Sequence, residues 1–325
     1  IVDSDERIRD AATSGLALLD NPRALDALLA ATQHASAPTR AATVRSLGDA
    51  PNEARVLTAV RAGLDDSDAW VRYYACQSLG KLQVTSAAEA IGGHLDDEAG
   101  QVRVAAVDAI AKLGGDLALK VLEKASLSTD LDVRRAALTG LGGLRRPGAF
   151  PLLLRAAESS DAATRIAAVS AISETSAPGA VGALIRAGSD PDARVRSLAF
   201  DLLATRPGPQ ATQWLIDRRA VESDRTHALD ALASAVDGRI EGVFAALDAS
   251  DATSSTWLID ALLRTRHPSG IAATEAALHL ENVHARRAAA SALATVDMPS
   301  ARDALAQAST LDSDPEVRRI CAAVV

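Results

Sequence analysis

Arginine recurs along the chain at intervals of about 31 residues, and a regular series of guanidinium groups can either bind anions or bridge carboxylates. From the first arginine of the series to the last, positions 9 to 318, there are 309 residues over ten intervals. Ten of the eleven positions hold arginine, and Ser255 takes the remaining one. The arginines are Arg9, Arg40, Arg72, Arg103, Arg134, Arg165, Arg196, Arg225, Arg286 and Arg318.

A residue that can cap a helix stands four residues before the repeated position in nine of the eleven copies. These residues are Asp5, Ser36, Asp68, Asp130, Asp161, Asp192, Asp251, Asn282 and Asp314. With an acid in the same helix and another in the next repeat, each arginine can bridge carboxylates and loop carbonyls between neighbours. We therefore interpret the series as structural, and we expect this ladder to include Arg72, Arg103, Arg134, Arg165 and Arg196.

The residues around each arginine predict two helices per repeat. An aliphatic residue follows each repeated position by seven residues, as Leu79 and Leu141 do, and the last of them is Val325. With the usual alanine at three residues after the arginine, these positions share one helical face, and a small residue at eight after lets a neighbouring helix approach closely. A second helix is expected at or just after a proline in most copies, since proline is tolerated at the first helical position. We expect an all-α superhelix of about ten to eleven antiparallel helix pairs.

Three strings carry a resemblance to a known family: DSDAWVRYYACQSLGKL at 66–82, DLDVRRAALTGLGGL at 130–144 and DPDARVRSLAFDLLA at 190–204. Their acid, valine–arginine, alanine and leucine–glycine pattern resembles the short HEAT repeat first described in phycobiliprotein lyases. The resemblance covers essentially the whole chain and implies that the arginine-bearing helices line a concave surface. We expect residues 1–325 to form a single HEAT-repeat solenoid, and this segment to be a fragment of a longer chain. Residues 221–260 depart from the pattern, so we expect looser stacking there.

Composition limits the function. Aromatic residues make up only 2% of the chain, so we expect a core of alanine, leucine, valine and isoleucine with no large aromatic-lined cofactor cavity, and no cofactor. A net charge of −8 argues against nucleic acid, which requires a basic surface. No segment has the roughly 18 apolar residues of a membrane span. Cys76 and Cys321 are expected to be free and buried, which favours the cytoplasm, and about thirty arginines beside four lysines suggest a bacterial genome.

Three enzymatic interpretations deserve comparison with the sequence. The six histidines are scattered, and no metal site is expected. Deoxyhypusine hydroxylases resemble the chain in length and repeat type, but the His–Glu dipeptides that hold their irons are absent here. The HEAT-like DNA glycosylases need inner-face aromatics, for which Trp70, Tyr73 and Trp257 are available, and a carboxylate such as Asp108 or Asp260, but the acidic charge opposes this function. A phycobilin-lyase-like accessory subunit remains the alternative function.

Exposed positions of the arginine-bearing helices are the expected site of function. Reading five residues after each arginine gives an acid-rich series that includes Asp108, Asp201, Asp230 and Asp260. Trp70 and Tyr73 lie three residues apart on one face of a helix, and we expect them to form a contact patch with Gln77. The alternative is that Trp70 folds over the preceding repeat. We expect a non-catalytic scaffold or docking module that binds a protein partner, through a basic or amphipathic segment, along the concave face.

Overall fold

The computed structural model describes residues 1, 3, 5–19 and 21–324, and the predicted last core position, Val325, lies outside the described residues. Every regular element in these residues is helical, and the α-helices number 21, which confirms the all-α prediction and the expected number of pairs. The chain divides into two compact units, Ile1–Ala177 and Pro178–Val325. The α-helices of the first unit are α1 (Glu6–Ala17), α2 (Pro22–Ala31), α3 (Ala37–Leu47), α4 (Ala54–Ala62), α5 (Ala69–Lys81), α6 (Ala88–Gly92), α7 (Gly100–Leu113), α8 (Gly115–Ala125), α9 (Leu131–Gly143), α10 (Ala149–Ala157) and α11 (Ala162–Ser173).

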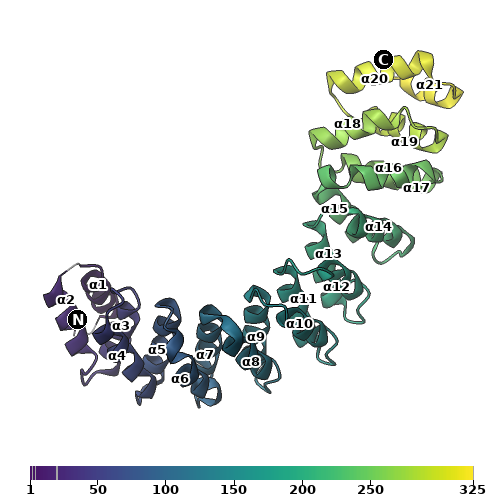
Figure 1. Ribbon diagram of the computed structural model, residues 1–325. Helices are drawn as coiled ribbons and strands as arrows, with labels where there is room; N and C mark the ends of the chain where they lie inside the picture. Colours follow the sequence, from purple (N-terminus) through teal and green to yellow (C-terminus); the bar gives the residue numbers. More distant parts are fainter. Residues whose placement is uncertain (2, 4, 20, 325) are drawn as a thin grey trace. The chain divides into compact units, whose positions relative to one another are not determined.

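The second unit continues the same alternation of helices. Its α-helices are α12 (Ala180–Ala187), α13 (Ala193–Ala204), α14 (Pro209–Asp217), α15 (Arg225–Ser234), α16 (Ile240–Asp248), α17 (Ala252–Leu263), α18 (Pro268–Ala277), α19 (Val283–Leu293), α20 (Pro299–Leu311) and α21 (Pro315–Ala322). Within each unit, every odd-numbered helix packs against the odd-numbered helices before and after it, and the even-numbered helices form a second layer (Figure 1). Each repeat therefore buries its apolar face mainly against its neighbours.

Small residues allow the odd-numbered helices to lie close together. A Cβ atom built on Gly80 would lie 2.9 Å from the Cα of Ala109, and one built on Gly142 would lie 2.7 Å from the carbonyl oxygen of Ala171. Both glycines stand eight residues after a repeated arginine, at the position where the sequence predicts a close approach. The aliphatic residue one position earlier, such as Leu141, is fully buried.

The capping residues lie where the sequence places them. Eight of the nine, all except Ser36, accept a hydrogen bond from a backbone N–H in the first turn of the helix that follows. Ser36 occupies the same position without such a bond. Because the caps hold these carboxylates at the start of each odd-numbered helix, the acids of successive repeats recur at a constant place beside the ladder arginines.

Each ladder arginine ties its helix to the loop that precedes it. Its Nη1 donates to the carbonyl oxygen six residues earlier, at 2.6 to 3.0 Å, in nine copies. In eight of these copies Nη1 also donates to the carbonyl oxygen five residues earlier. The copies are Arg9, for which the residue five positions earlier lies outside the described residues, and Arg40, Arg72, Arg103, Arg134, Arg165, Arg196, Arg286 and Arg318.

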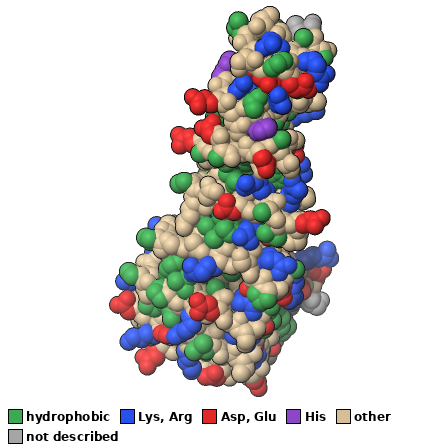
Figure 2. All heavy atoms as spheres, turned by 90° about the vertical axis from the view of Figure 1, so that its right-hand side faces the viewer, with side chains coloured by type: hydrophobic (Ala, Val, Ile, Leu, Met, Phe, Trp, Pro, Cys, Tyr) green, Lys and Arg blue, Asp and Glu red, His purple; other side chains and the backbone are tan. Residues whose placement is uncertain are grey.

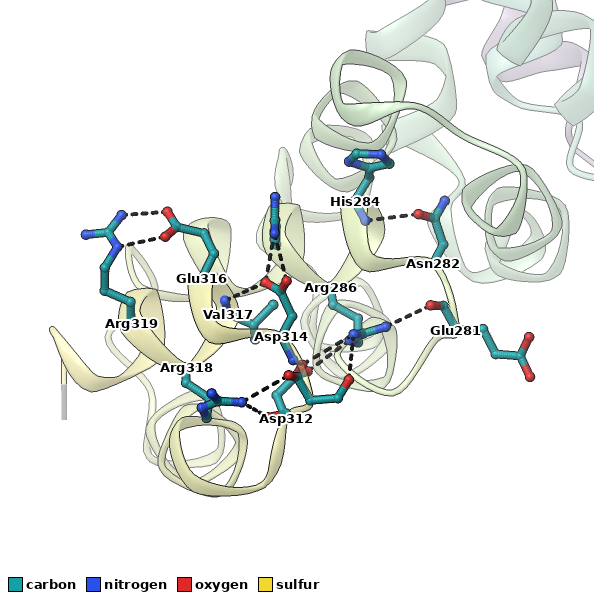
Figure 3. Close-up of polar contacts among 12 residues, drawn as sticks. Glu281, Asn282, His284, Arg286, Asp312, Asp314, Glu316, Val317, Arg318 and Arg319 are labelled. Atoms are coloured by element: carbon teal, nitrogen blue, oxygen red, sulfur yellow. Dashed lines mark hydrogen bonds and ion pairs between the residues drawn. The ribbon is translucent and has the colours of Figure 1, made fainter.

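The other guanidinium nitrogens of several ladder arginines reach a carboxylate of the following repeat, in one of two registers. Arg72 pairs with Asp97 through two hydrogen bonds of 2.8 and 2.9 Å, and Asp97 also accepts the backbone N–H of Ala99. Arg40 and Asp66 have the same arrangement. So do Arg286 and Asp312, which are drawn in Figure 3. Arg103 and Arg134 instead bind the capping residue itself, Asp130 and Asp161.

The buried pair of Arg72 and Asp97 should make the fold sensitive to acid. The hydrogen bonds from Arg72 lower the pKa of the Asp97 carboxyl to about 2, well below its ordinary value. Because the folded-state pKa is depressed, this contribution to stability is complete above about pH 4 and is lost as the pH falls through about 2. We expect Asp97→Asn to flatten the pH dependence of the free energy of unfolding between pH 4 and 2, measured by urea denaturation; an unchanged slope would contradict this.

Two sequence assignments need correction. The spacing places Arg225 in the ladder, but it is the first residue of α15 and is exposed, so its guanidinium lies a turn too early in the helix. The glycosylase interpretation uses Trp257 as an inner-face aromatic, whereas its side chain is buried in the core with only 7% exposed. The looser stacking expected at 221–260 stays a prediction.

The missing arginine at Ser255 is replaced from the next repeat. The side-chain amide nitrogen of Asn282 donates to the carbonyl oxygens of Leu247 at 2.6 Å and Ser250 at 2.8 Å, close to where a ladder arginine would donate. The Asn282 Oδ1 accepts the backbone N–H of His284 and so still caps α19. Asparagine serves here because its amide can donate to carbonyls, whereas a carboxylate only accepts. The Ser255 hydroxyl is buried against that of Ser250, with 2.6 Å between the oxygens.

Substitutions at positions 282 and 255 should test this replacement. We expect Asn282→Asp to lower the free energy of unfolding by about 1 to 3 kcal/mol, because the carbonyls of Leu247 and Ser250 lose a donor and face a carboxylate. Adding Ser255→Arg should recover part of that loss, since an arginine can then donate to the carbonyls and pair with the carboxylate introduced at position 282. A double-mutant cycle by chemical denaturation measures this coupling, and simple additivity would contradict the replacement.

Candidate functional site

Three aromatic side chains form a cluster on α5. The ring centroids of Trp70 and Tyr73 are 5.3 Å apart in an edge-on arrangement, those of Tyr73 and Tyr74 are 5.0 Å apart, and those of Trp70 and Tyr74 are 6.2 Å apart. Trp70 is 52% exposed, while the two tyrosines are half-buried. An exposed tryptophan supported by two tyrosines presents a rigid apolar surface to solvent, which is typical of interface residues.

The helix start and the core on the opposite face position this cluster. Asp68 accepts the backbone N–H of Trp70 at 2.9 Å, so the tryptophan lies in the first turn of α5. Val71 and Ala75 are buried against the neighbouring helices, which leaves positions 70, 73, 74 and 77 on the other side. Gln77 donates to the Tyr73 hydroxyl at 2.6 Å. The predicted patch of Trp70, Tyr73 and Gln77 is thus brought together, and Tyr74, which the sequence pattern does not single out, belongs to it.

A first groove, here called the Trp70 groove, lies between α1, α3 and α5. It has a volume of about 310 Å³, with Trp70 and Tyr74 among its lining residues. Arg45 of α3 pairs with Asp10 of α1 at 2.7 Å, and its guanidinium carbon lies 5.4 Å from the centre of the Tyr74 ring. Charge within this groove is therefore partly compensated by the protein itself.

A second groove, here called the Tyr73 groove, lies on the other side of the cluster, between α5, α7 and α9. Its volume is about 570 Å³. The lining residues are Tyr73, Gly100, Gln101, Val104, Asp108, Asp130, Asp132, Arg135, Ala136 and Thr139. Asp108 and Thr139 stand five residues after a ladder arginine, which is where the sequence predicts exposed positions. The aromatic cluster thus separates two grooves that together cross the odd-numbered helices from α1 to α9.

Of the acidic residues predicted to form the binding surface, Asp108 lines the Tyr73 groove. Desolvation raises the pKa of its carboxyl above the ordinary value, with Lys112 acting in the opposite direction. Burial also raises the pKa of the Tyr73 hydroxyl, and the charges of Tyr74 and Asp108 contribute to that shift. The carboxylate and the phenol line the same groove, and partial desolvation there accounts for both shifts.

The three remaining acidic candidates are not part of this site. Asp201, Asp230 and Asp260 belong to the second unit and are exposed. Arg264 compensates two of them, with 2.5 Å from its Nε to Asp230 and 3.5 Å from its Nη1 to Asp260. The repeat pattern in the sequence could not show these ion pairs, because Arg264 is not one of the ladder arginines.

The groups that could support chemistry are few in the described part of the chain. Both cysteines are free and buried, and desolvation raises the pKa of the Cys76 thiol to about 12, so it stays protonated at neutral pH. The described residues contain no cluster of three or more metal-ligating side chains. On the face drawn in Figure 2, acidic and basic side chains are interspersed. None of the described helices has the length and apolar character that crossing a membrane requires.

Comparison with known proteins agrees with this geometry. Stacked helix pairs joined by a ladder of polar side chains define the chain as an α-solenoid, and the family model for HEAT repeats matches residues 57–137 and 126–204. The chain thus contains HEAT repeats, as the resemblance in its sequence implies. No curated protein matches the sequence.

Several solved structures are similar in fold. A chain in the complex of Kap95p with RanGDP is 13% identical with a TM-score of 0.53, and the match covers 99% of this chain and 55% of that one. A chain of the CpcE–CpcF complex of phycocyanin lyase from Nostoc is 20% identical with a TM-score of 0.42, over 75% of this chain and 96% of that one. Human deoxyhypusine hydroxylase is 23% identical with a TM-score of 0.35, over 76% and 97%. At these identities the likeness concerns the fold alone.

Proposed function

We propose that the chain is a non-catalytic protein-interaction scaffold or docking module, and that a protein partner binds the face formed by α1, α3, α5, α7 and α9. The exposed aromatic cluster of Trp70, Tyr73 and Tyr74 is the observation that supports this. In a chain whose core is built from small aliphatic residues, three aromatics gathered at the surface are costly to hydrate unless a partner covers them. The Kap95p complex gives an example of a solenoid of similar fold that holds a protein, RanGDP.

Replacing two of these aromatics tests the proposal. We expect Trp70→Ala with Tyr73→Ala to reduce partner recovery in affinity capture by about 30-fold or more, as loss of a hot spot of roughly 2 kcal/mol would. The helical circular dichroism should be nearly unchanged, because Trp70 is exposed and Tyr73 is only half-buried. Leu127→Ala is a matched control, since Leu127 is 70% exposed and lies outside both grooves.

Two results would count against the proposal. Undiminished capture by the double variant would show that the partner binds elsewhere. A large fall in melting temperature would show that the aromatic pair belongs to the core. The identity of the captured partner also distinguishes the proposed function from the alternative. An accessory subunit of a modifying enzyme would retain that enzyme.

A further inference from the structure

Two of the three carboxylates in the Tyr73 groove are compensated by the protein. Asp130 accepts hydrogen bonds from Arg103, the shorter of them 2.5 Å, and also caps α9. Asp132 pairs with Arg135 at 3.4 Å. Asp108 forms no hydrogen bond or ion pair with any described residue, and Lys112, one turn further along α7, is the one cation that acts on it appreciably. Among the three, Asp108 is therefore the carboxylate without a hydrogen-bonded or ion-paired partner in the described residues.

The surroundings of Asp108 fit the stem of a long basic side chain. Val104 lies one turn before it on the same face of α7, and Ala136 of α9 lines the groove as well. The ring of Tyr73 forms another part of the lining and can attract a cation through its π face. An apolar wall, an aromatic ring and a lone carboxylate together match a lysine or arginine, whose aliphatic stem and charged end need different surroundings.

The Trp70 groove differs in charge. There Arg45 already pairs with Asp10 and lies against Tyr74, and Arg9 is also present. Two guanidinium groups, those of Arg9 and Arg45, line this groove together with the carboxylates of Glu6, Asp10 and Asp68. The Tyr73 groove also has three carboxylates but one guanidinium group, that of Arg135, so it is the more acidic of the two. The charge pattern therefore sets a direction across α5, with an apolar contact at Trp70 and a cationic contact beyond Tyr73.

We propose that the partner inserts a lysine or arginine side chain into the Tyr73 groove, with its charge against Asp108 and its stem against Tyr73 and Val104. An apolar side chain of the same segment covers Trp70. This inference rests on the proposed function and specifies the chemistry of the partner segment. Asp108 is the residue that selects a basic segment over an acidic or neutral one.

A random peptide library displayed on phage can test this with the intact chain. Peptides retained by the wild-type chain but not by the Trp70→Ala, Tyr73→Ala variant should be enriched in lysine or arginine next to an apolar residue. One enriched peptide is then synthesised, and its Kd is measured by fluorescence anisotropy. We expect Asp108→Asn to weaken it about tenfold, and changing the basic residue of the peptide to alanine to have no further effect in that variant. Asp201→Asn, the same register position in the second unit, is the control and should leave Kd unchanged.

The outcomes distinguish failure of the Asp108 contact from failure of the proposed function. Peptides that depend on Trp70 and Tyr73 but show no basic enrichment, or bind Asp108→Asn as tightly as the wild type, would overturn the Asp108 contact and leave the interaction face intact. If the wild-type chain retains no peptide that the Trp70→Ala, Tyr73→Ala variant fails to retain, this face does not recognise a peptide segment. That result would overturn both the Asp108 contact and the proposed binding of a segment.

Discussion

Replacing Arg72 by alanine should lower the free energy of unfolding by about 3 to 5 kcal/mol, the range for removing one partner of a buried ion pair. The Arg72 side chain is 10% exposed and that of Asp97 is 6% exposed. Arg72 donates to the carbonyl oxygens of Asp66 and Ser67 as well as to both oxygens of Asp97. Its loss removes the ion-pair partner of a buried carboxylate, which keeps only the Ala99 N–H and the His94 ring as polar partners among the described residues, and the donor of two carbonyls, in two repeats at once.

Denaturation with urea, followed by circular dichroism, measures this effect. Arg55→Ala is the matched control, because Arg55 also forms two ion pairs, with Glu53 and Asp26, but its side chain is 44% exposed. We expect little change for Arg55, since water replaces exposed pairs readily. Equal shifts for the two variants would contradict the structural role of the ladder. Arg72→Lys should be intermediate, since a lysine cannot donate in the same forked geometry.

Replacing Arg239 by alanine should also destabilise the chain by about 3 to 5 kcal/mol, through lost hydrogen bonds and an internal cavity. Arg239 precedes α16 and is 1% exposed. Its Nη2 donates to the carbonyl oxygens of Leu203 at 2.7 Å and Ala204 at 3.2 Å, at the end of α13. A positive charge is favourable there, because the carbonyls at the C-terminus of a helix carry partial negative charge.

Burial lowers the pKa of Arg239 to about 10, and the guanidinium therefore remains charged at neutral pH. Arg225→Ala is a suitable control in the same unit, because Arg225 is exposed at the start of α15. Thermal and chemical denaturation of both variants would measure the difference. If Arg239→Ala unfolded at the same denaturant concentration as Arg225→Ala, the buried contact with α13 would not be stabilising.

The helices, their starts and the repeat follow from the sequence because they depend on local chemistry. Aspartate before the first turn, an aliphatic residue at a helical spacing and glycine at the helix contact each act within a few residues, so reading them requires no tertiary information. The same reasoning places Trp70, Tyr73 and Gln77 on one face of α5. It fails at Arg225, where one arginine happens to fall near the period but begins a helix.

Only the tertiary structure decided which groups from different repeats meet. The sequence shows an acid near each arginine, but whether Arg72 takes Asp97 or Arg103 takes the cap Asp130 depends on how the next helix pair stacks. The same holds for Asn282 at the place of the missing arginine, for Arg239 beneath α13, and for Arg45 beside Tyr74. Asp108 is one of several aspartates that stand five residues after the repeated position, and it differs because the folded chain places it in one groove with Tyr73. Contacts across repeats depend on side-chain reach in three dimensions, which periodicity does not encode.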